Sequence, residues 1–327
     1  MSTKKFMDHV DNFQVAFQRD EKATSAVSSA RGTWKKYAAK MIVAPSPPHV
    51  DIELTNICDL ECDFCETLVM QRKKGSMSLA MFQRVVDQCA EAGVPSIKLN
   101  LWGESLLNKK LIPMIEYAKK RCKAAIQFNT NANRLTPKIA EKLVLAGLDC
   151  ITISVDGFTK ETYEKLRIKG KYDVVLKNID GLLEARARHN SAIPEITMQI
   201  IKMKENIDEV EAFVAYWKER VDQVSTTNIG TTSTPGVLNH SVRINFLKGR
   251  KPCDQIWQRL SVLWDGRVTV CCNDFDGSLV VGDVLKDRLA ALWAGERLTS
   301  LREKHLKLDF SNLICGTCTD SMIHDNS

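Results

Sequence analysis

The sequence predicts an α/β fold in which a partial (βα)6 barrel is followed by a small α+β domain. Short runs rich in β-branched residues alternate with longer amphipathic stretches from residue 50 to about residue 230, as in parallel strands joined by helices. After about residue 250 the alternation ends, and a hairpin signal and several cysteines follow. The proline-rich residues 45–48 make a break before the first strand.

The alternation places six strands and the helices between them. We expect strands at residues 50–55, 97–101, 126–129, 151–155, 196–201 and 224–228. We expect helices at residues 79–92, 107–122, 137–146 and 174–188. In such a barrel the loops at the carboxyl ends of the strands converge on one site, so functional side chains are expected there.

Three parts are expected along the chain: a helical extension over residues 1–48, the barrel over residues 49–245 and the small domain over residues 246–327. The sequence leaves open whether the extension caps the bottom of the barrel. In the last part, Asp265-Gly266 separates the apolar residues 262–264 and 268–270, which predicts a β-hairpin. Residues 285–306 are expected to form one helix.

Composition excludes several classes of protein. With 44% hydrophobic and 26% charged residues among 327, the chain is typical of a globular protein. Basic and acidic residues are interspersed and the net charge is only +6, so we expect neither a nucleic-acid nor a membrane partner. No apolar run approaches the roughly 18 residues of a membrane span, and no signal peptide is evident, so a cytoplasmic location is expected. In the reducing cytoplasm, the eleven cysteines favour metal or redox chemistry over disulfides.

Three of these cysteines lie directly behind the first expected strand. Cys58, Cys62 and Cys65 are spaced C-x3-C-x2-C on one loop. Three thiolates at this spacing can hold three irons of a [4Fe-4S] cluster and leave the fourth iron open. A zinc site and a group of buried thiols are the alternatives, but structural zinc takes four ligands and this loop supplies three.

With aromatic Phe64 before the last cysteine, the motif resembles that of the radical S-adenosylmethionine (SAM) superfamily. The resemblance covers residues 50 to about 230 and implies a TIM-like partial barrel. It also implies an enzyme that binds SAM at the open iron and cleaves it reductively to methionine and a 5'-deoxyadenosyl radical, which abstracts hydrogen from a C–H bond. An electron donor such as flavodoxin or ferredoxin would be a partner.

The resemblance extends to the expected SAM site. Trp102-Gly103-Glu104 occupies the place of the family's Gly-Gly-Glu run, which implies that Gly103 and Glu104 lie against the SAM amino group, in a space narrowed by Trp102. Ser154 and Asp156, at the end of the fourth strand, resemble the ribose-contacting position. Asp156 alternatively caps a helix that begins near Thr159. Asn131 is expected close to the same pocket.

The later cysteines resemble those of the twitch domain, a shortened SPASM domain. By that pattern Cys253, Cys271, Cys315 and Cys318 ligate one auxiliary [4Fe-4S] cluster, which gives two clusters in all. A zinc ribbon is the alternative. Because four protein ligands would saturate the cluster, we expect it to transfer electrons rather than to bind substrate.

The spacing of the later cysteines resembles that of the 2-deoxy-scyllo-inosamine dehydrogenases. Cys272, which has no role in this ligand set, resembles the cysteine that donates a hydrogen atom in radical SAM sugar epimerases. Cys272 alternatively packs behind the cluster. We therefore expect a polar small-molecule substrate, a sugar or aminocyclitol, that is oxidised or epimerised. A peptide-modifying enzyme and a non-catalytic metal-binding scaffold are the alternatives. The general base stays open among four residues: Arg167, Gln199, Asn228 and His240.

Overall fold

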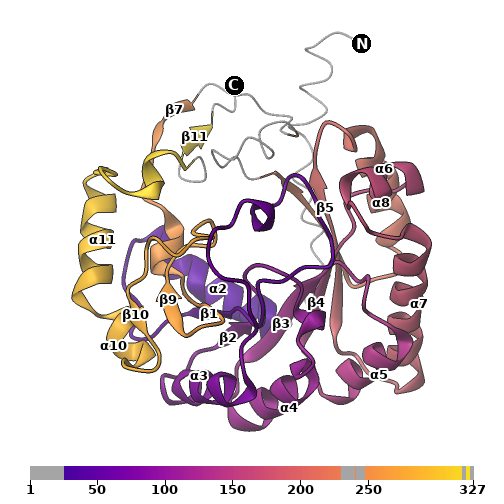
Figure 1. Cartoon of the computed structure of the whole chain (residues 1–327), viewed down its shortest axis with the longest axis horizontal. Helices are drawn as coiled ribbons and strands as arrows, with labels where there is room; N and C mark the ends of the chain where they lie inside the picture. Colours follow the sequence, from indigo (N-terminus) through magenta and orange to yellow (C-terminus); the bar gives the residue numbers. More distant parts are fainter. Residues whose placement is uncertain (1–25, 230–239, 241–246, 319–321, 325–327) are drawn as a thin grey trace.

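The structure, a computed structural model, describes residues 26–229, 240, 247–318 and 322–324. Six parallel strands curve into an open barrel (Figure 1). These strands are β1 (His49–Ile52), β2 (Ser96–Lys98), β3 (Ala125–Thr130), β4 (Cys150–Ser154), β5 (Glu195–Lys202) and β6 (Gln223–Asn228). All six predicted strands are present, and neighbours in sequence are neighbours in the sheet, which confirms the predicted partial (βα)6 barrel.

Helices cover the outside of the barrel (Figure 1). They are α3 (Leu79–Glu91), α4 (Leu111–Arg121), α5 (Pro137–Leu145), α6 (Lys160–Leu166), α7 (Tyr172–Arg188) and α8 (Val210–Trp217). Three of the six begin with a side-chain cap: the Ser78 side chain accepts from the N–H of Met81, Thr136 caps α5 with Pro137 in its first turn, and Thr159 caps α6. Among the described residues, no helix has the length and apolar character needed to cross a membrane.

The two faces of the barrel strands differ in polarity. In β1, Val50 and Ile52 join the apolar core under the helices, whereas His49 and Asp51 lie on the other face. His49 Nδ1 lies 2.9 Å from Ser96 Oγ of β2, so polar side chains pair with each other across neighbouring strands. The barrel interior is therefore polar and hydrogen-bonded, which suits a fold that receives a polar ligand at one end.

The small domain continues the barrel sheet. Strand β8 (Arg259–Val262) runs parallel to β1, and β9 (Arg267–Thr269) and β10 (Gly282–Asp283) follow in antiparallel order. The predicted hairpin is confirmed, with Val262 opposite Val268. A second, two-stranded sheet pairs β7 (Leu247–Arg250) with β11 (Met322–His324). The single helix predicted over residues 285–306 is wrong in part: Gly295 separates α10 (Leu289–Trp293) from α11 (Glu296–Leu306).

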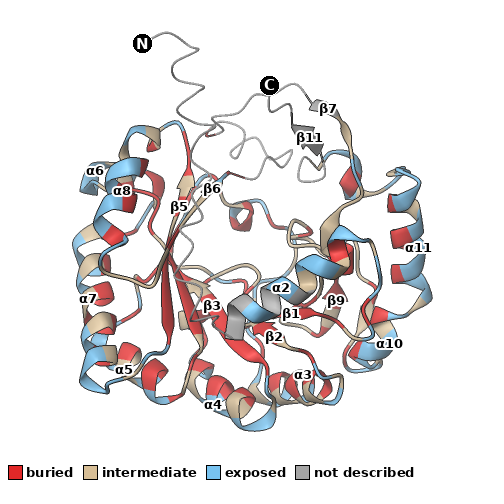
Figure 2. Cartoon of the chain, turned by 180° about the vertical axis from the view of Figure 1, so that it is seen from behind, coloured by how far each residue is buried: buried red, intermediate tan, exposed pale blue. Residues whose placement is uncertain are grey.

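The described part of the N-terminal extension is a helix, α2 (Ala26–Ala39), which packs against β3 and against the turn η4 (Asp254–Trp257). Figure 2 shows it lying across β1 to β3 at the back of the molecule. Its Trp34 contacts His49 edge to face, with 4.4 Å between ring centroids, and lies 5.8 Å from the guanidinium of Arg259. Because His49 and Arg259 are the first residues of their strands, α2 covers the amino end of the barrel. Residues 1–25 lie outside the described part.

Candidate active site

The loops that follow the first four strands meet at a cavity of about 300 Å³. Figure 1 shows the loop after β1 running into the middle of the ring of strands. The predicted site residues among the described residues that line the cavity are Cys58, Cys62, Phe64, Cys65, Gly103, Glu104, Asn131 and Ser154. These residues, up to 96 positions apart in the sequence, are thus brought to one place.

The three thiols of the first motif share this cavity. Burial is the main cause that raises the pKa of Cys58 to about 12 and that of Cys62 to about 11. Within the described residues, no three His, Cys, Asp or Glu side chains converge closely enough to hold a single metal ion. Three thiols on one loop can ligate three irons of a [4Fe-4S] cluster, whereas structural zinc takes four protein ligands. A cluster would bind them as thiolates and displace their protons.

Gly103 has a backbone that other residues cannot easily adopt. Its φ is +75°, and a Cβ built there would lie 2.5 Å from the carbonyl oxygen of Thr55 and 2.8 Å from that of Ile57. The next residue, Glu104, donates its N–H to the same Ile57 carbonyl at 2.8 Å. The loop after β2 is therefore pressed against the start of the cysteine loop, and glycine makes this contact possible.

Replacing Gly103 by alanine tests this contact, with Gly93 as a matched control. Gly93 also has a positive φ, +64°, but no atom lies within 4 Å of a Cβ built there. We expect Gly93→Ala to destabilise folding by the left-handed strain alone, about 1–2 kcal/mol. Gly103→Ala should cost about 1–3 kcal/mol more, because backbone must also move. Denaturant unfolding measures both, and equal losses would contradict the packing role.

Glu104 is a buried carboxylate held by three donors. It is 2% exposed and accepts from Thr130 Oγ1 at 2.9 Å, from the N–H of Asn131 at 2.9 Å and from the N–H of Leu106 at 3.1 Å. Burial raises the pKa of Glu104 to about 7, although these hydrogen bonds oppose the rise. A cationic ligand group in the cavity would favour the charged form.

Neighbouring polar groups complete this wall. Asn131 donates from Nδ2 to Asp59 Oδ1 at 3.0 Å, and the same nitrogen lies 3.9 Å from Cys58 Sγ. On the other side, Ser154 donates to Gln199 Oε1 at 3.2 Å, and both line the cavity. Hydroxyl and amide groups of this kind suit ligand hydroxyls.

The structure does not bring Asp156 into the cavity lining. Asp156 is fully buried, pairs with Arg167 and accepts from the N–H of Ile201 at 2.7 Å. The capping alternative also fails, because Thr159 itself caps α6. The direct ribose contact suggested by the sequence has no support in this geometry, because the buried Asp156 lies outside the cavity lining.

Arg167, which the sequence offers only as a candidate base, lies beside the cavity instead. Its guanidinium lines the cavity, pairs with Asp156 and lies 5.6 Å from the centre of the Phe64 ring. Its Nε is buried and has no hydrogen-bond partner among the described residues. A buried, unpaired donor at a cavity wall points to an anionic or polar ligand atom. Arg167 directly follows the short helix α6, and an arginine at the end of a helix is common, so the local sequence does not mark it as a site residue.

Two of the other three candidate bases, His240 and Asn228, lie elsewhere. His240 sits between two carboxylates, 3.1 Å from Asp63 Oδ1 and 3.0 Å from Glu205 Oε1, and packs edge-on against Phe64. Asn228 is the exposed last residue of β6. Of the four candidates, only Arg167 and Gln199 are among the described residues that line the cavity.

Trp102 joins the cavity to the small domain. Its ring lines the cavity and meets Phe275 edge to face, with 6.1 Å between centroids. Its indole Nε1 is buried and has no partner in the described part of the chain. The tryptophan that replaces the expected glycine therefore forms a wall toward the later cysteines.

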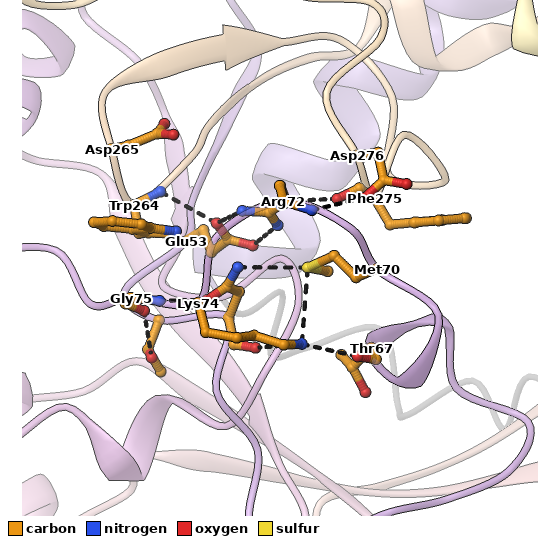
Figure 3. Close-up of polar contacts among 12 residues, drawn as sticks. Glu53, Thr67, Met70, Arg72, Lys74, Gly75, Trp264, Asp265, Phe275 and Asp276 are labelled. Carbon is orange, nitrogen blue, oxygen red and sulfur yellow. Dashed lines mark hydrogen bonds and ion pairs between the residues drawn. The ribbon is translucent and has the colours of Figure 1, made fainter.

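A buried polar network fastens the same two regions together (Figure 3). Arg72, on the segment after the cysteine loop, forms a two-pronged pair with Glu53 and donates to the carbonyl of Phe275. Glu53 also accepts from the N–H of Trp264 at 3.1 Å, and Asp276 accepts from the N–H of Arg72 at 3.2 Å. The network holds the cysteine loop, β1 and the small domain in one arrangement.

The later cysteines also gather. The main cause that raises the pKa of Cys253 to about 12 is burial, and the neighbouring thiols of Cys318, Cys272 and Cys315 raise it further. The N–H of Asn273 donates to Cys271 Sγ at 3.3 Å, and Asn273 Nδ2 lies 3.8 Å from Cys318 Sγ. This donor set is all sulfur, which fits a cluster held by four thiolates.

Cys272 lies in this second group and not beside the cavity. A hydrogen bond between Cys272 and Cys271 is the main cause that raises the pKa of Cys271, and Cys272 Sγ lies 3.8 Å from Asn273 Oδ1. Among the described residues that line the cavity, the thiols are those of Cys58, Cys62 and Cys65. The packing alternative for Cys272 thus accords with its position.

Comparison with known proteins agrees with this architecture. The Radical SAM superfamily model matches residues 52–216, half of the chain, and the SPASM iron-sulfur cluster-binding domain model matches residues 253–319. Mycofactocin maturase MftC of Mycolicibacterium smegmatis is 24% identical over 163 residues, which are 50% of this chain but only 40% of that protein. The tungsten-containing aldehyde ferredoxin oxidoreductase cofactor-modifying protein of Pyrococcus furiosus is 22% identical, with 84% and 87% covered.

Solved structures show the same fold. BtrN, solved in complex with AdoMet and 2-DOIA, has a TM-score of 0.55 at 16% identity, over 84% of this chain and 92% of BtrN. Streptococcus suis SuiB, bound to precursor peptide SuiA, has a TM-score of 0.65 at 12% identity, over 96% of this chain and 80% of SuiB. With its barrel, its two cysteine groups and these matches, the chain belongs to the Radical SAM superfamily and carries a SPASM domain, so that its cofactors are SAM and [4Fe-4S] clusters.

Proposed function

We propose that this protein abstracts a hydrogen atom from a polar small molecule, a sugar or aminocyclitol, and oxidises one of its hydroxyl groups. The observation that carries the proposal is the single cavity that joins the thiols of Cys58, Cys62 and Cys65 to the hydrogen-bonding groups of Glu104, Ser154 and Arg167. When bound, SAM and its cluster would supply the radical that takes a hydrogen atom from carbon, the auxiliary cluster would accept the remaining electron, and a general base would take the hydroxyl proton.

The residues of the chain bind and orient SAM in this proposal. Glu104, fixed by three donors, faces the SAM ammonium group, and the unpaired Nε of Arg167 faces an anionic group such as the SAM carboxylate. Asp156 keeps the guanidinium in place from behind. Ser154 and Gln199 receive ribose or substrate hydroxyls. Cys58, Cys62 and Cys65 ligate the first cluster, and Cys253, Cys271, Cys315 and Cys318 the second.

Arg167→Lys tests the positioning of SAM. Lysine keeps the charge but loses the planar guanidinium that reaches Asp156, the Phe64 ring and the cavity at once. We expect SAM affinity, measured by equilibrium binding to the reconstituted protein, to fall about tenfold or more, as for the loss of one charge-assisted hydrogen bond. Arg186→Lys is the matched control, because Arg186 pairs with Asp222 and does not line the cavity. Equal affinity of the two variants would contradict the assignment.

Oxidation is favoured over epimerisation because inversion of a carbon needs a hydrogen-atom donor beside the substrate. Cys272 is the candidate donor, and it lies with the auxiliary cysteines. Turnover in heavy water of candidate sugars and aminocyclitols separates the outcomes. A carbonyl product without a new C–D bond supports oxidation. Deuterium at carbon that disappears in Cys272→Ala would establish epimerisation instead.

Peptide modification is the second candidate function. The specific observation in its favour is the likeness to SuiB, whose solved structure holds a precursor peptide and covers 96% of this chain. Mycofactocin maturase, a further relative, points the same way, although the chain spans 40% of its length. Incubation with peptides encoded near this gene, followed by mass spectrometry, tests this candidate. A mass change in such a peptide, with none in polar small molecules, would replace the first proposal.

A further inference from the structure

The last cysteine pair is held by an arginine that lies outside the cysteine motifs. Arg250, the final residue of β7, donates from Nη1 to the carbonyl of Cys315 and from Nη2 to the carbonyls of Gly316 and Cys318, both at 2.8 Å. One guanidinium therefore binds three carbonyls of one turn, residues 315–318, which we call the terminal turn. Its planar fork of donors makes this possible, and lysine could not reproduce it.

The terminal turn needs such a partner. It overlaps the end of the 3-10 helix η5 (Ile314–Gly316), and the N–H of Cys318 donates to the carbonyl of Cys315 at 3.3 Å. The last carbonyls of a helical turn point the same way and carry partial negative charge, which a cation at that end stabilises. The Arg250 guanidinium also lies 4.9 Å from the centre of the Phe310 ring, which fixes it from the other side.

The charge of Arg250 lies close to two of the proposed cluster ligands, because its guanidinium donates to the backbone carbonyls of Cys315 and Cys318. Arg259 also lies near the cysteine group, beside Cys271 and Cys272, but it pairs with Asp51 at 3.2 Å. The partners that the described residues give Arg250 are carbonyls and an aromatic ring, so its charge is not cancelled by a carboxylate there.

The nearby carboxylate of Asp274 is engaged elsewhere. Asp274 is 2% exposed and accepts from Thr269 Oγ1 at 2.6 Å, from the N–H and Oγ of Ser278 and from the N–H of Leu279. These hydrogen bonds spread its charge and hold the loop after Cys272. Arg250, in contrast, is hydrogen-bonded directly to the terminal turn.

We propose that Arg250 is a positioning residue of the auxiliary cluster, which holds the terminal turn and raises the reduction potential of the cluster bound there. Reduction adds one negative charge to a cluster, so a fixed cation beside two of its ligands stabilises the reduced form. A higher potential favours the acceptance of an electron. The inference rests on the auxiliary ligand set given under the proposed function.

The test is a redox titration of the anaerobically reconstituted full-length protein, followed by electron paramagnetic resonance. Cys62→Ala identifies the auxiliary signal, and in the other samples the SAM-binding cluster serves as an internal reference. In Arg250→Gln we expect about a tenfold shift of the auxiliary redox equilibrium toward the oxidised form, about 59 mV lower for a one-electron couple. The reference cluster should not move. Arg288→Gln, which removes an exposed charge of the same domain, should leave both potentials unchanged.

The outcomes separate this inference from the proposed function. Wild-type protein with iron for one cluster only would overturn the auxiliary ligand set. A loaded auxiliary cluster with an unchanged potential in Arg250→Gln would overturn the inference alone. If the Arg250→Gln variant fails to bind the auxiliary cluster, the Arg250→Lys variant is the second test. Partial loss of auxiliary iron in Arg250→Lys, with an unchanged reduction potential of the remaining cluster, supports the role of Arg250. Full loading, or a lowered potential although the charge remains, would overturn it.

Discussion

Alanine in place of Cys62 will abolish the release of 5'-deoxyadenosine from SAM and remove about half of the protein-bound iron. Cys62 is 6% exposed and lines the cavity together with Cys58 and Cys65. With two thiolates left on the loop, the first cluster loses a third of its protein ligands, while the four auxiliary thiols are untouched. Liquid chromatography of the nucleoside products and iron analysis of the anaerobically reconstituted protein measure the two effects.

Cys122→Ser is the matched control for this variant. Cys122 is a half-buried thiol after α4 that donates to the carbonyl of Ala118 at 3.1 Å and lies outside both cysteine groups. Its replacement should leave iron content and nucleoside release close to those of the wild type. Nucleoside release by Cys62→Ala at the control's rate would mean that the loop does not carry the radical chemistry.

Arg72→Met will produce the largest loss of stability expected from a single side chain. The side chains of Arg72 and Glu53 are 4% and 0% exposed, and the substitution leaves the buried Glu53 carboxylate with the N–H of Trp264. Removal of one partner from a buried ion pair destabilises folding by about 3–5 kcal/mol. Denaturant unfolding of wild-type and variant protein measures the difference.

Two further variants show whether the buried charge is the cause. Arg121→Met breaks the ion pair between Arg121 and Asp87, whose side chains are 50% and 36% exposed, respectively. This substitution should change the free energy of unfolding by less than about 1 kcal/mol. The double variant Arg72→Met with Glu53→Leu removes both charges and should regain much of the lost stability. A double variant as unstable as Arg72→Met alone would contradict this explanation and would point to lost contacts with Phe275 and Asp276 instead.

The barrel and the cysteine positions could be predicted because they depend on local patterns. Alternating strand and helix signals place all six barrel strands, and the Asp265-Gly266 turn places the β8–β9 hairpin. The break of the last helix at Gly295 was missed, since a single glycine between two amphipathic stretches does not decide between a kinked and an interrupted helix. The pairing of β7 with β11 joins segments 72 or more residues apart, and short strands at this separation leave no joint signal.

The roles of side chains that act through tertiary contacts could not be predicted from the sequence. Asp156 has the position of a ribose ligand in the sequence, but its carboxylate pairs with Arg167, eleven residues later, and Arg167 lines the cavity instead. Glu53 and Arg72 are ordinary charged residues until the fold buries both. Arg250 reaches the terminal turn across 65 to 68 positions of sequence, and no local pattern marks it.

The most direct test is the response of the first cluster to SAM. In a Cys271→Ala, Cys315→Ala background, which removes two of the proposed auxiliary ligands, the reduced protein should show one [4Fe-4S] signal by electron paramagnetic resonance. Addition of SAM should change the g values of that signal, because SAM occupies the open iron beside Cys58, Cys62 and Cys65. A signal that SAM leaves unchanged, or protein that carries zinc in place of iron and sulfide, would contradict the assignment.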